Sequence, residues 1–158
     1  MDRRSFVSDT ASPLMFNHIG HAVTDLGRSR AFYEEALGFD FWRQLELPDQ
    51  PSGRILRLPP PLGLTVCYLR GGGIVLELLH FAGEGAHPVN PRSRPMNEIG
   101  LTHLSLSVGD LAETCQLVAR FGGLVLEDTD MGTGIFVRDP DHQLIELMTM
   151  SYYKRVNC

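Results

Sequence analysis

The chain has no apolar run that approaches the roughly 18 to 20 residues needed to cross a membrane. It also has no excess of basic residues, because 14 Lys and Arg against 19 Asp and Glu leave a net charge of −5. General nucleic-acid binders present a basic face. We therefore expect neither a membrane nor a nucleic-acid partner, and a small molecule is the default.

Cysteine is scarce as well. The three cysteines, Cys67, Cys115 and Cys158, are an odd number without the spacing of a metal site, and no apolar signal sequence follows Arg3 and Arg4. This predicts a reduced, cytoplasmic location. Free cysteines are most simply small packed side chains, so Cys67 and Cys115 are interpreted as core residues rather than nucleophiles.

What the sequence does have is an internal repeat. Residues 18–26 read His-Ile-Gly-His-Ala-Val-Thr-Asp-Leu, and residues 103–111 read His-Leu-Ser-Leu-Ser-Val-Gly-Asp-Leu, at an offset of 103 − 18 = 85. This pattern is typical of a half-buried strand that leads into a capped helix. A second match, Glu77 with Glu146, has an offset of 146 − 77 = 69, so the first half holds an insertion of 85 − 69 = 16 residues.

The repeat and the positions of Gly and Pro define the expected domain organisation. At 158 residues the chain suits one domain. The expected segments are a flexible leader at 1–13, a single domain at 14–150 with βαβββ units at 14–81 and 99–150 joined by a linker at 82–98, and a polar tail at 151–158.

Strands and helices are expected in the same order in both units, which gives an α+β fold. In the first unit they are a strand at 14–23, a helix from Asp25 to Gly38, a strand at 39–45, a proline-rich loop at 48–63 with a helical turn at 52–57, and strands at 64–69 and 74–81. In the second unit they are a strand at 101–108, a helix at 110–121, and strands at 124–128, 133–138 and 142–149.

Two carboxylates stand where a strand should be most buried. Glu77 and Glu146 each lie within a run of large aliphatic residues, and removing a carboxylate from water is costly unless it is paired. His18 and His103 begin the other repeated strand, and neutral imidazole is the commonest metal ligand in proteins. Two His and two Glu suit a divalent cation such as Zn, Ni, Co, Mn or Fe(II), without selecting among them.

Each of the four residues also has a structural interpretation. A single buried histidine more often bonds to a carbonyl than to a metal, and a single strand glutamate can face solvent at a sheet edge. Their matched positions favour a joint site, because independent accidents rarely fall at equivalent places of a repeat. The resulting hypothesis is one divalent ion held by both histidines and both glutamates.

These residues also carry a family resemblance, over about residues 14–150. It rests on the tandem βαβββ pattern, Asn17-His-Ile-Gly running to Asp25-Leu26, the segment 31–39 (Ala-Phe-Tyr-Glu-Glu-Ala-Leu-Gly-Phe), and Arg138-Asp-Pro-Asp leading to Glu146. The chain thereby resembles the vicinal oxygen chelate superfamily, which includes glyoxalase I, methylmalonyl-CoA epimerase, extradiol dioxygenases, and bleomycin and fosfomycin resistance proteins. The resemblance implies a curved, eight-stranded mixed sheet cup with flanking helices.

The resemblance further implies a chemistry. His18, Glu77, His103 and Glu146 stand where glyoxalase I holds its metal, and related epimerases often have Gln in place of the first Glu. In both enzymes the metal is a Lewis acid that chelates substrate oxygens, and a metal-side carboxylate moves a proton on the neighbouring carbon. We therefore expect a substrate with vicinal or chelating oxygens. Family members usually form homodimers, so the site can lie within one chain or between two.

Some positions depart from the family pattern. Ala22 stands where bacterial glyoxalase I usually has an arginine for glutathione, which makes a glutathione hemithioacetal a less suitable substrate. His142 replaces the usual Gly after Asp-Pro-Asp, and its ring can approach the pocket or cap the turn. Candidate pocket residues, among them two arginines for an anionic substrate tail and several that could equally be core, are Trp42, Arg54, Arg57, Tyr68, Phe136, His142 and Met148.

Three functions remain open at this point. The leading hypothesis is a metal-dependent isomerase or lyase of glyoxalase or epimerase type. One alternative is an Fe(II) ring-cleaving dioxygenase, against which a fourth ligand at Glu77 counts. The other is a protein that binds an antibiotic or metabolite without chemistry.

Overall fold

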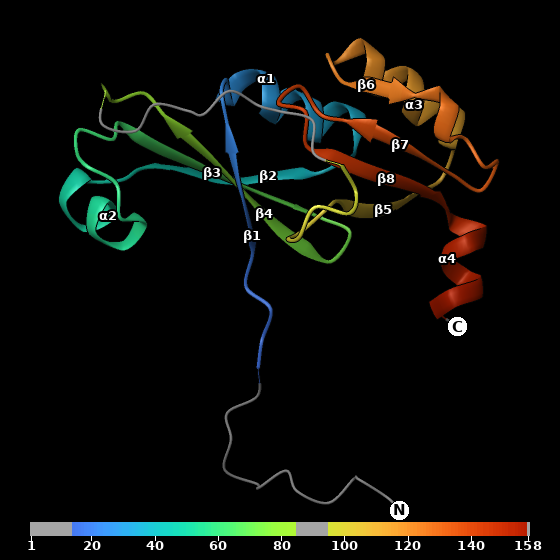
Figure 1. Cartoon of the computed structure of the whole chain (residues 1–158), viewed down its shortest axis with the longest axis horizontal. Coiled ribbons are helices and arrows are strands. Elements are labelled where there is room, and N and C mark those ends of the chain that lie inside the picture. Colours follow the sequence, from blue (N-terminus) through green and yellow to red (C-terminus); the bar gives the residue numbers. More distant parts are fainter. Residues whose placement is uncertain (1–13, 85–94, 158) are drawn as a thin grey trace, which may run out of the picture.

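The computed structural model describes residues 14–84 and 95–157 (Figure 1). The expected leader at 1–13, residues 85–94 of the linker, and Cys158 lie outside the described residues. The described chain forms two βαβββ units followed by a C-terminal helix.

The first unit begins with a strand and a capped helix. The Asp25 carboxylate accepts a hydrogen bond from the Arg28 backbone N–H at 2.9 Å, which caps the helix. Gly38, at φ +70°, turns the chain after it, as the sequence predicts. The elements are β1 (Ile19–Val23), α1 (Leu26–Ala31), the π-helical turn η1 (Phe32–Ala36), β2 (Asp40–Glu46), α2 (Asp49–Leu56), β3 (Leu64–Gly71) and β4 (Ile74–Phe81).

The second unit repeats this order. Asp110 caps its helix by accepting from the Glu113 backbone N–H at 2.9 Å, and the two caps are 110 − 25 = 85 residues apart, the offset of the sequence repeat. The elements are β5 (Leu104–Val108), α3 (Leu111–Arg120), β6 (Leu124–Leu126), the 3₁₀ turn η3 (Glu127–Thr129), β7 (Gly134–Arg138) and β8 (Leu144–Thr149).

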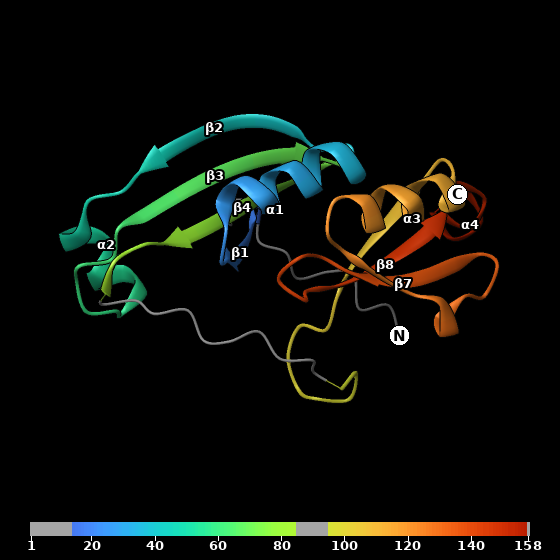
Figure 2. The same cartoon turned by 90° about the horizontal axis from the view of Figure 1, so that it is seen from above.

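The eight strands form two four-stranded mixed sheets, in the orders β1-β4-β3-β2 and β5-β8-β7-β6. In each sheet the first strand of the unit runs parallel to the last, and the other pairs are antiparallel. The α+β fold and the repeat are thus confirmed. The described strands pair as two sheets rather than as one continuous sheet, and their open, curved arrangement fits a cup (Figure 2).

One hydrophobic core joins the two units. α3 contacts η1, and the helices of the two units lie side by side in Figures 1 and 2. Because strand side chains alternate, the neighbours of the core residues point to the opposite face of each sheet. Buried core members from both units include Phe32, Tyr33, Leu69, Leu76, Leu78, Val118, Ile135, Val137, Ile145 and Leu147.

The structure corrects the starts of two strands. β1 begins at Ile19 rather than at residue 14, and β5 begins at Leu104 rather than at residue 101. β1 pairs in parallel with β4, and the first residue of β4 lies opposite residue 17 (19 − 2). In the same way, the first residue of β8 lies opposite residue 103 (104 − 1) in the pairing with β5. Described residues before these positions have no partner strand. Residues 14–17 accordingly extend away from the sheets (Figure 1).

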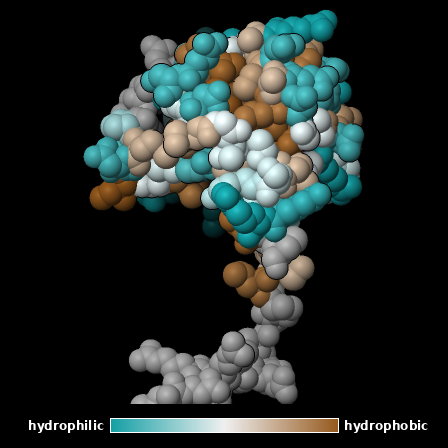
Figure 3. Space-filling view, turned by 90° about the vertical axis from the view of Figure 1, so that its right-hand side faces the viewer, coloured by the Kyte–Doolittle hydropathy of each residue, from teal (hydrophilic) through white to brown (hydrophobic). Residues whose placement is uncertain are grey.

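The expected polar tail is instead a helix, α4 (Met150–Asn157), which follows β8 directly. Thr149 helps to start it, because its hydroxyl accepts a hydrogen bond from the Tyr152 backbone N–H at 3.4 Å. Seen from the side of the second unit, hydrophobic and hydrophilic side chains are interspersed over the surface (Figure 3). None of the helices in the described ranges is both long and apolar enough to span a membrane.

The proline-rich insertion folds as predicted, with some extra length. The helical turn expected at 52–57 is α2, which begins earlier, at Asp49. The Asp49 carboxylate accepts from the Leu62 backbone N–H at 2.9 Å, which ties the insertion together. Beneath it lies a small second core of Leu62, Leu64 and Val66 at one end of the first sheet.

Candidate functional site

One histidine and one glutamate meet on the face of the first sheet that is turned away from the shared core. Gly20 pairs with Glu77 across β1 and β4, and His18 lies two residues earlier, on the same face. The His18 Nε2 atom is 3.1 Å from Glu77 Oε2, and the side chains are 38% and 12% exposed. A ligand can therefore reach the pair, which we name the first half-site.

Both side chains of the first half-site are held by neighbours. Asn17 Oδ1 lies 2.6 Å from His18 Nδ1. The Tyr68 hydroxyl donates to Glu77 Oε1 at 2.5 Å, because the two residues face each other across β3 and β4. Burial and this hydrogen bond raise the pKa of Tyr68, against the opposing charge of Arg43. The phenol is therefore a hydrogen-bond donor at neutral pH.

The second unit contains a matching pair, which we name the second half-site. Ser105 pairs with Glu146 across β5 and β8, and His103 lies two residues before Ser105. His103 Nε2 is 3.7 Å from Glu146 Oε2, with exposed fractions of 26% and 30%. Thr102 Oγ1 is 2.9 Å from His103 Nδ1, and the Ser105 hydroxyl donates to Glu146 Oε2 at 2.6 Å.

The chemistry of both half-sites suits a divalent ion. In each, the residue before the histidine contacts Nδ1, which leaves Nε2 for a metal, as in sites where an outer contact orients the imidazole. Two ligands that are each about 2.1 Å from a metal and at a right angle lie about 3.0 Å apart. The first half-site has 3.1 Å between His18 Nε2 and Glu77 Oε2. Two carboxylates would also balance the charge of such an ion.

A single chain does not bring the four predicted ligands to one point. Within the part of one chain that the structure describes, no group of three or more His, Cys, Asp or Glu side chains could hold an ion. The structure brings His18 to Glu77 and His103 to Glu146, and it does not bring the two pairs together.

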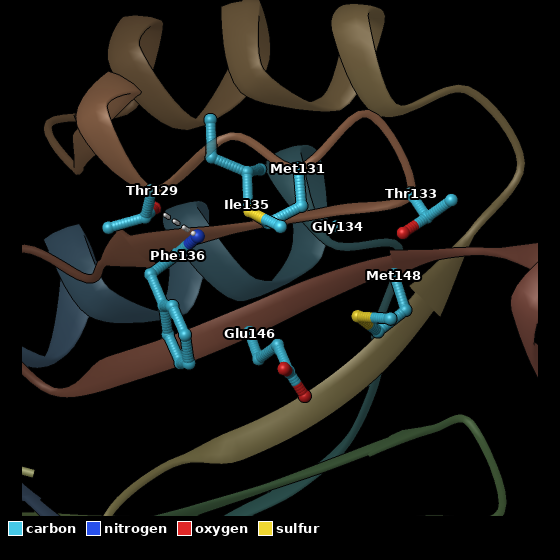
Figure 4. A pocket seen from close by; sticks show the side chains of 8 residues that line it. All are labelled: Thr129, Met131, Thr133, Gly134, Ile135, Phe136, Glu146 and Met148. Atoms are coloured by element: carbon cyan, nitrogen blue, oxygen red, sulfur yellow. Dashed lines mark hydrogen bonds between the residues drawn. The ribbon is translucent and has the colours of Figure 1, made fainter.

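A cavity of about 240 Å³ adjoins the second half-site. Glu146 reaches it from β8, between Phe136 and Met148 (Figure 4). Gly134 lets the Met148 sulfur lie against β7, where a Cβ would overlap it. The lining thus combines one carboxylate with apolar and hydroxyl groups; its members are Thr129, Met131, Thr133, Gly134, Ile135, Phe136, Glu146 and Met148.

The aromatic and apolar pocket candidates are divided between the two half-sites. Phe136, Glu146 and Met148 line the cavity. Tyr68 and Trp42 lie instead beside the first half-site, with ring centroids 5.8 Å apart. The pocket predicted from the sequence is therefore distributed over two places in one chain.

The remaining three pocket candidates line neither place. Arg54 and Arg57 are exposed at α2, where Arg57 is the left-handed C-cap at φ +57°. His142 is exposed in the turn before β8 at φ +67°, and its backbone N–H donates to Asp139 O at 2.9 Å. Its backbone thus takes the left-handed conformation that favours the usual glycine.

Two further side chains, His21 and the predicted core residue Cys67, belong to the shared core rather than to a half-site. His21 lies on the core-facing side of β1, with Nε2 2.7 Å from the buried Asp139 Oδ2, which also accepts from the Tyr33 hydroxyl at 2.9 Å. Burial, then the Asp139 charge, raise the pKa of Tyr33. Cys67 is fully buried, and burial raises the pKa of its thiol, so it is a packed residue.

Sequence reasoning overlooked the residues that contact the two histidines. Asn17 and Thr102 precede the two histidines at an offset of 102 − 17 = 85, so the repeat itself could have identified them. The lining residues between Thr129 and Ile135 carry no comparable signal, because they read as an ordinary loop entering a strand.

Residues 15–147 match the model of the Glyoxalase/Bleomycin resistance protein/Dioxygenase superfamily. The chain therefore belongs to this superfamily, which confirms the resemblance seen in the sequence.

Individual relatives include two named enzymes. The chain is 30% identical over 141 residues to a probable lactoylglutathione lyase of Synechocystis sp., covering 84% of this chain and 92% of that protein. It is 27% identical over 95 residues to the mitochondrial methylmalonyl-CoA epimerase of Bos taurus, covering 60% of this chain and 47% of that protein. A glyoxalase family protein from Bacillus cereus shares the fold, with a TM-score of 0.76, 15% identity, and 90% and 98% of the two chains covered.

Proposed function

We propose that this chain is a divalent-metal-dependent isomerase or lyase of the glyoxalase I or epimerase type, which moves a proton on the carbon next to a carbonyl. The observation that carries the proposal is the pair of half-sites, each a His and a Glu at equivalent register positions of the two sheets. The relatives named lactoylglutathione lyase and methylmalonyl-CoA epimerase support this class of reaction.

The two half-sites together would hold the metal ion, which when bound would act as a Lewis acid toward a substrate oxygen. Glu146 takes the proton, since its carboxylate belongs to a half-site and also lines the cavity where the substrate carbon would lie. Ser105 holds that carboxylate in place through its 2.6 Å hydrogen bond. Glu77, held by Tyr68, is the carboxylate on the other side of the site.

A second copy of the chain completes the site in this proposal. Since one chain, over its described residues, brings no three ligands together, the first half-site of one copy would face the second half-site of the other. Leu14, Met15 and Phe16, which lead into the first half-site, are 99%, 77% and 67% exposed. Such a segment suits contact with a partner, which supports the homodimer expected from the sequence.

Glu146→Gln tests the residue that moves the proton. We expect turnover to fall about 100- to 10,000-fold, the usual contribution of a general base. The readout is deuterium exchange from solvent at the substrate carbon, followed by NMR in metal-loaded protein. The substrates are methylmalonyl-CoA and the hemithioacetal of glutathione and methylglyoxal.

The matched control is Glu35→Gln, which removes the same charge from an exposed position on η1 and should keep wild-type exchange. Thermal unfolding shows that both variants are folded. Full exchange in Glu146→Gln would contradict the assigned role, and no exchange in the wild-type protein with either substrate would contradict the proposed class of reaction.

A further inference from the structure

The first sheet carries a row of basic and aromatic side chains that the proposed function leaves unused. Arg70 and Arg43 both lie over the Trp42 ring, and Arg43 also lies over the Tyr68 ring. Tyr68 in turn donates to Glu77 at 2.5 Å. The row therefore runs from an exposed part of the sheet directly to the first half-site.

A β-bulge places Trp42 and Arg43 on the same face. Phe41 pairs with Leu69 and Arg43 pairs with Tyr68, so Trp42 is an extra residue in β2. In a regular strand neighbouring side chains point to opposite faces, whereas a bulge re-aims one of them. The Trp42 and Tyr68 rings are 5.8 Å apart, and Arg43 Cζ is 4.7 Å from the Tyr68 ring, so both bulge residues face the half-site.

The stacked arginines keep most of their hydrogen-bond donors available, although Arg43 also interacts with the Tyr68 hydroxyl. Arg70 Cζ is 3.6 Å from the Trp42 ring centroid, and Arg43 Cζ is 4.4 Å from it. A guanidinium carries five N–H donors in its plane, so stacking on a ring leaves the edge of the group for an anion. Stacking also orders two long side chains in advance, which lowers the entropy that a ligand must overcome.

Neither Arg43 nor Arg70 forms an ion pair within residues 14–84 and 95–157. Arg30, on the neighbouring helix, pairs with Glu34 at 2.9 Å. By contrast, no carboxylate among the described residues lies within 4.0 Å of Arg43 or Arg70. Even Asp40, the cross-strand neighbour of Arg70, makes no ion pair with it. Two positive charges that have no carboxylate partner in the described part of the chain thus flank one exposed aromatic ring.

We propose that Arg43, Trp42 and Arg70 bind the anionic group of the substrate, a carboxylate or a phosphate, beside the first half-site. The inference rests on the proposed function, because it takes the anion to belong to the same substrate. The apolar cavity at Glu146 then receives the uncharged end of the molecule. The proposed substrate is therefore an anion with a charged tail at one end and a small apolar group at the other. Its chelating oxygens lie between the two.

Trp42 is the only tryptophan of the chain, so its fluorescence reports on this row alone. In the metal-free full-length protein we expect a saturable emission change with glutathione, a carboxylate probe, or with coenzyme A, a phosphate probe. Arg43→Gln and Arg70→Gln should each raise the apparent Kd about 10-fold, the usual effect of losing a charged hydrogen bond. Added NaCl should weaken binding, since the groups are exposed.

The control is Arg120→Gln, which removes an exposed arginine at the end of α3 and should keep the wild-type Kd. Saturation with glutathione only would show that the site prefers a carboxylate, and saturation with coenzyme A only would show that it prefers a phosphate. Saturation with both would show that the site recognises the negative charge that they share. No saturable change with either probe would overturn the proposal. Wild-type Kd values in both Arg43→Gln and Arg70→Gln would also overturn it. The same holds if probe binding is instead lost when Arg54→Gln is combined with Arg57→Gln.

The titration measures binding without turnover. Failure of the proposed function would appear as absent deuterium exchange and would leave the fluorescence result unaffected. Failure of the anion site would appear in the titration alone.

Discussion

At the residue scale, Glu77 and Glu146 are held differently although they occupy equivalent positions. Glu77 uses Oε1 for Tyr68 and Oε2 for His18. Glu146 uses Oε2 for Ser105 and also directs it toward His103, and Oε1 accepts no hydrogen bond from the described residues. Both Glu77 oxygens therefore have a partner, whereas Glu146 keeps one oxygen without a hydrogen bond among the described residues, which agrees with the different roles proposed for them.

Tyr68→Phe tests how the first half-site is held. The change removes the hydrogen bond to Glu77 Oε1 and leaves the ring. We expect the affinity for Zn²⁺ to fall about 10- to 100-fold, as when an outer contact of a metal ligand is lost. Competition with a chelator measures it, and Tyr153→Phe on the exposed side of α4 is the control. Wild-type affinity in Tyr68→Phe would show that the hydroxyl does not position Glu77.

At the scale of elements, the turn between β7 and β8 fastens the second unit to the first. The buried Asp141 carboxylate accepts hydrogen bonds from Thr24, from Arg28 at 3.0 Å and from Ser29 at 3.0 Å, around the start of α1. Burial alone would raise the pKa of Asp141, but the bonds from Thr24 and Ser29 and the Arg28 charge lower it overall. This turn fixes the arrangement of the two units, and so of the half-sites.

Asp141→Asn should loosen that attachment in a pH-dependent way. Because the folded-state pKa lies below the unfolded one, charged Asp141 stabilises the fold above about pH 4 and loses its effect as the pH falls through the folded value. We expect the variant to lose about 1 to 3 kcal/mol of unfolding free energy at pH 7, because buried partners are left unsatisfied. Urea unfolding at pH 7 and pH 3 should show this difference shrinking in acid.

The exposed Asp128→Asn is the control for that measurement and should differ little from wild type at either pH. A difference between Asp141→Asn and wild type that stays constant from pH 7 to pH 3 would contradict the assigned role of the carboxylate.

The elements themselves were largely predictable, because their signals are local. Asp25 and Asp110 cap helices in the structure as they do in the sequence pattern, and Gly38 ends one. The bulge at Trp42 was not predictable, since it depends on how β2 pairs with β3. The starts of β1 and β5 likewise depend on where the partner strand begins. Pairing is a tertiary property, which periodicity within one strand does not contain.

At the scale of the whole molecule, the shared core faces one side of each sheet, and the half-sites face the other. The identity of the four candidate ligands follows from the repeat, because each unit carries the same His and Glu positions. Where they meet could not be derived from the sequence, because that depends on how folded units, and in our proposal two copies, associate.

The central claim is that one half-site from each of two copies forms one metal centre. Its most direct test uses two variants: His18→Ala with Glu77→Gln, and His103→Ala with Glu146→Gln. The variants carry different tags, so that mixed dimers can be isolated, loaded with Zn²⁺ and subjected to elemental analysis.

A symmetric dimer has two equivalent sites, and the mixed dimer keeps one of them intact. We expect about half a zinc ion per chain in the mixed dimer and none in either variant alone. A mixed dimer as empty as its parents, or a wild-type zinc content in either variant alone, would contradict the account.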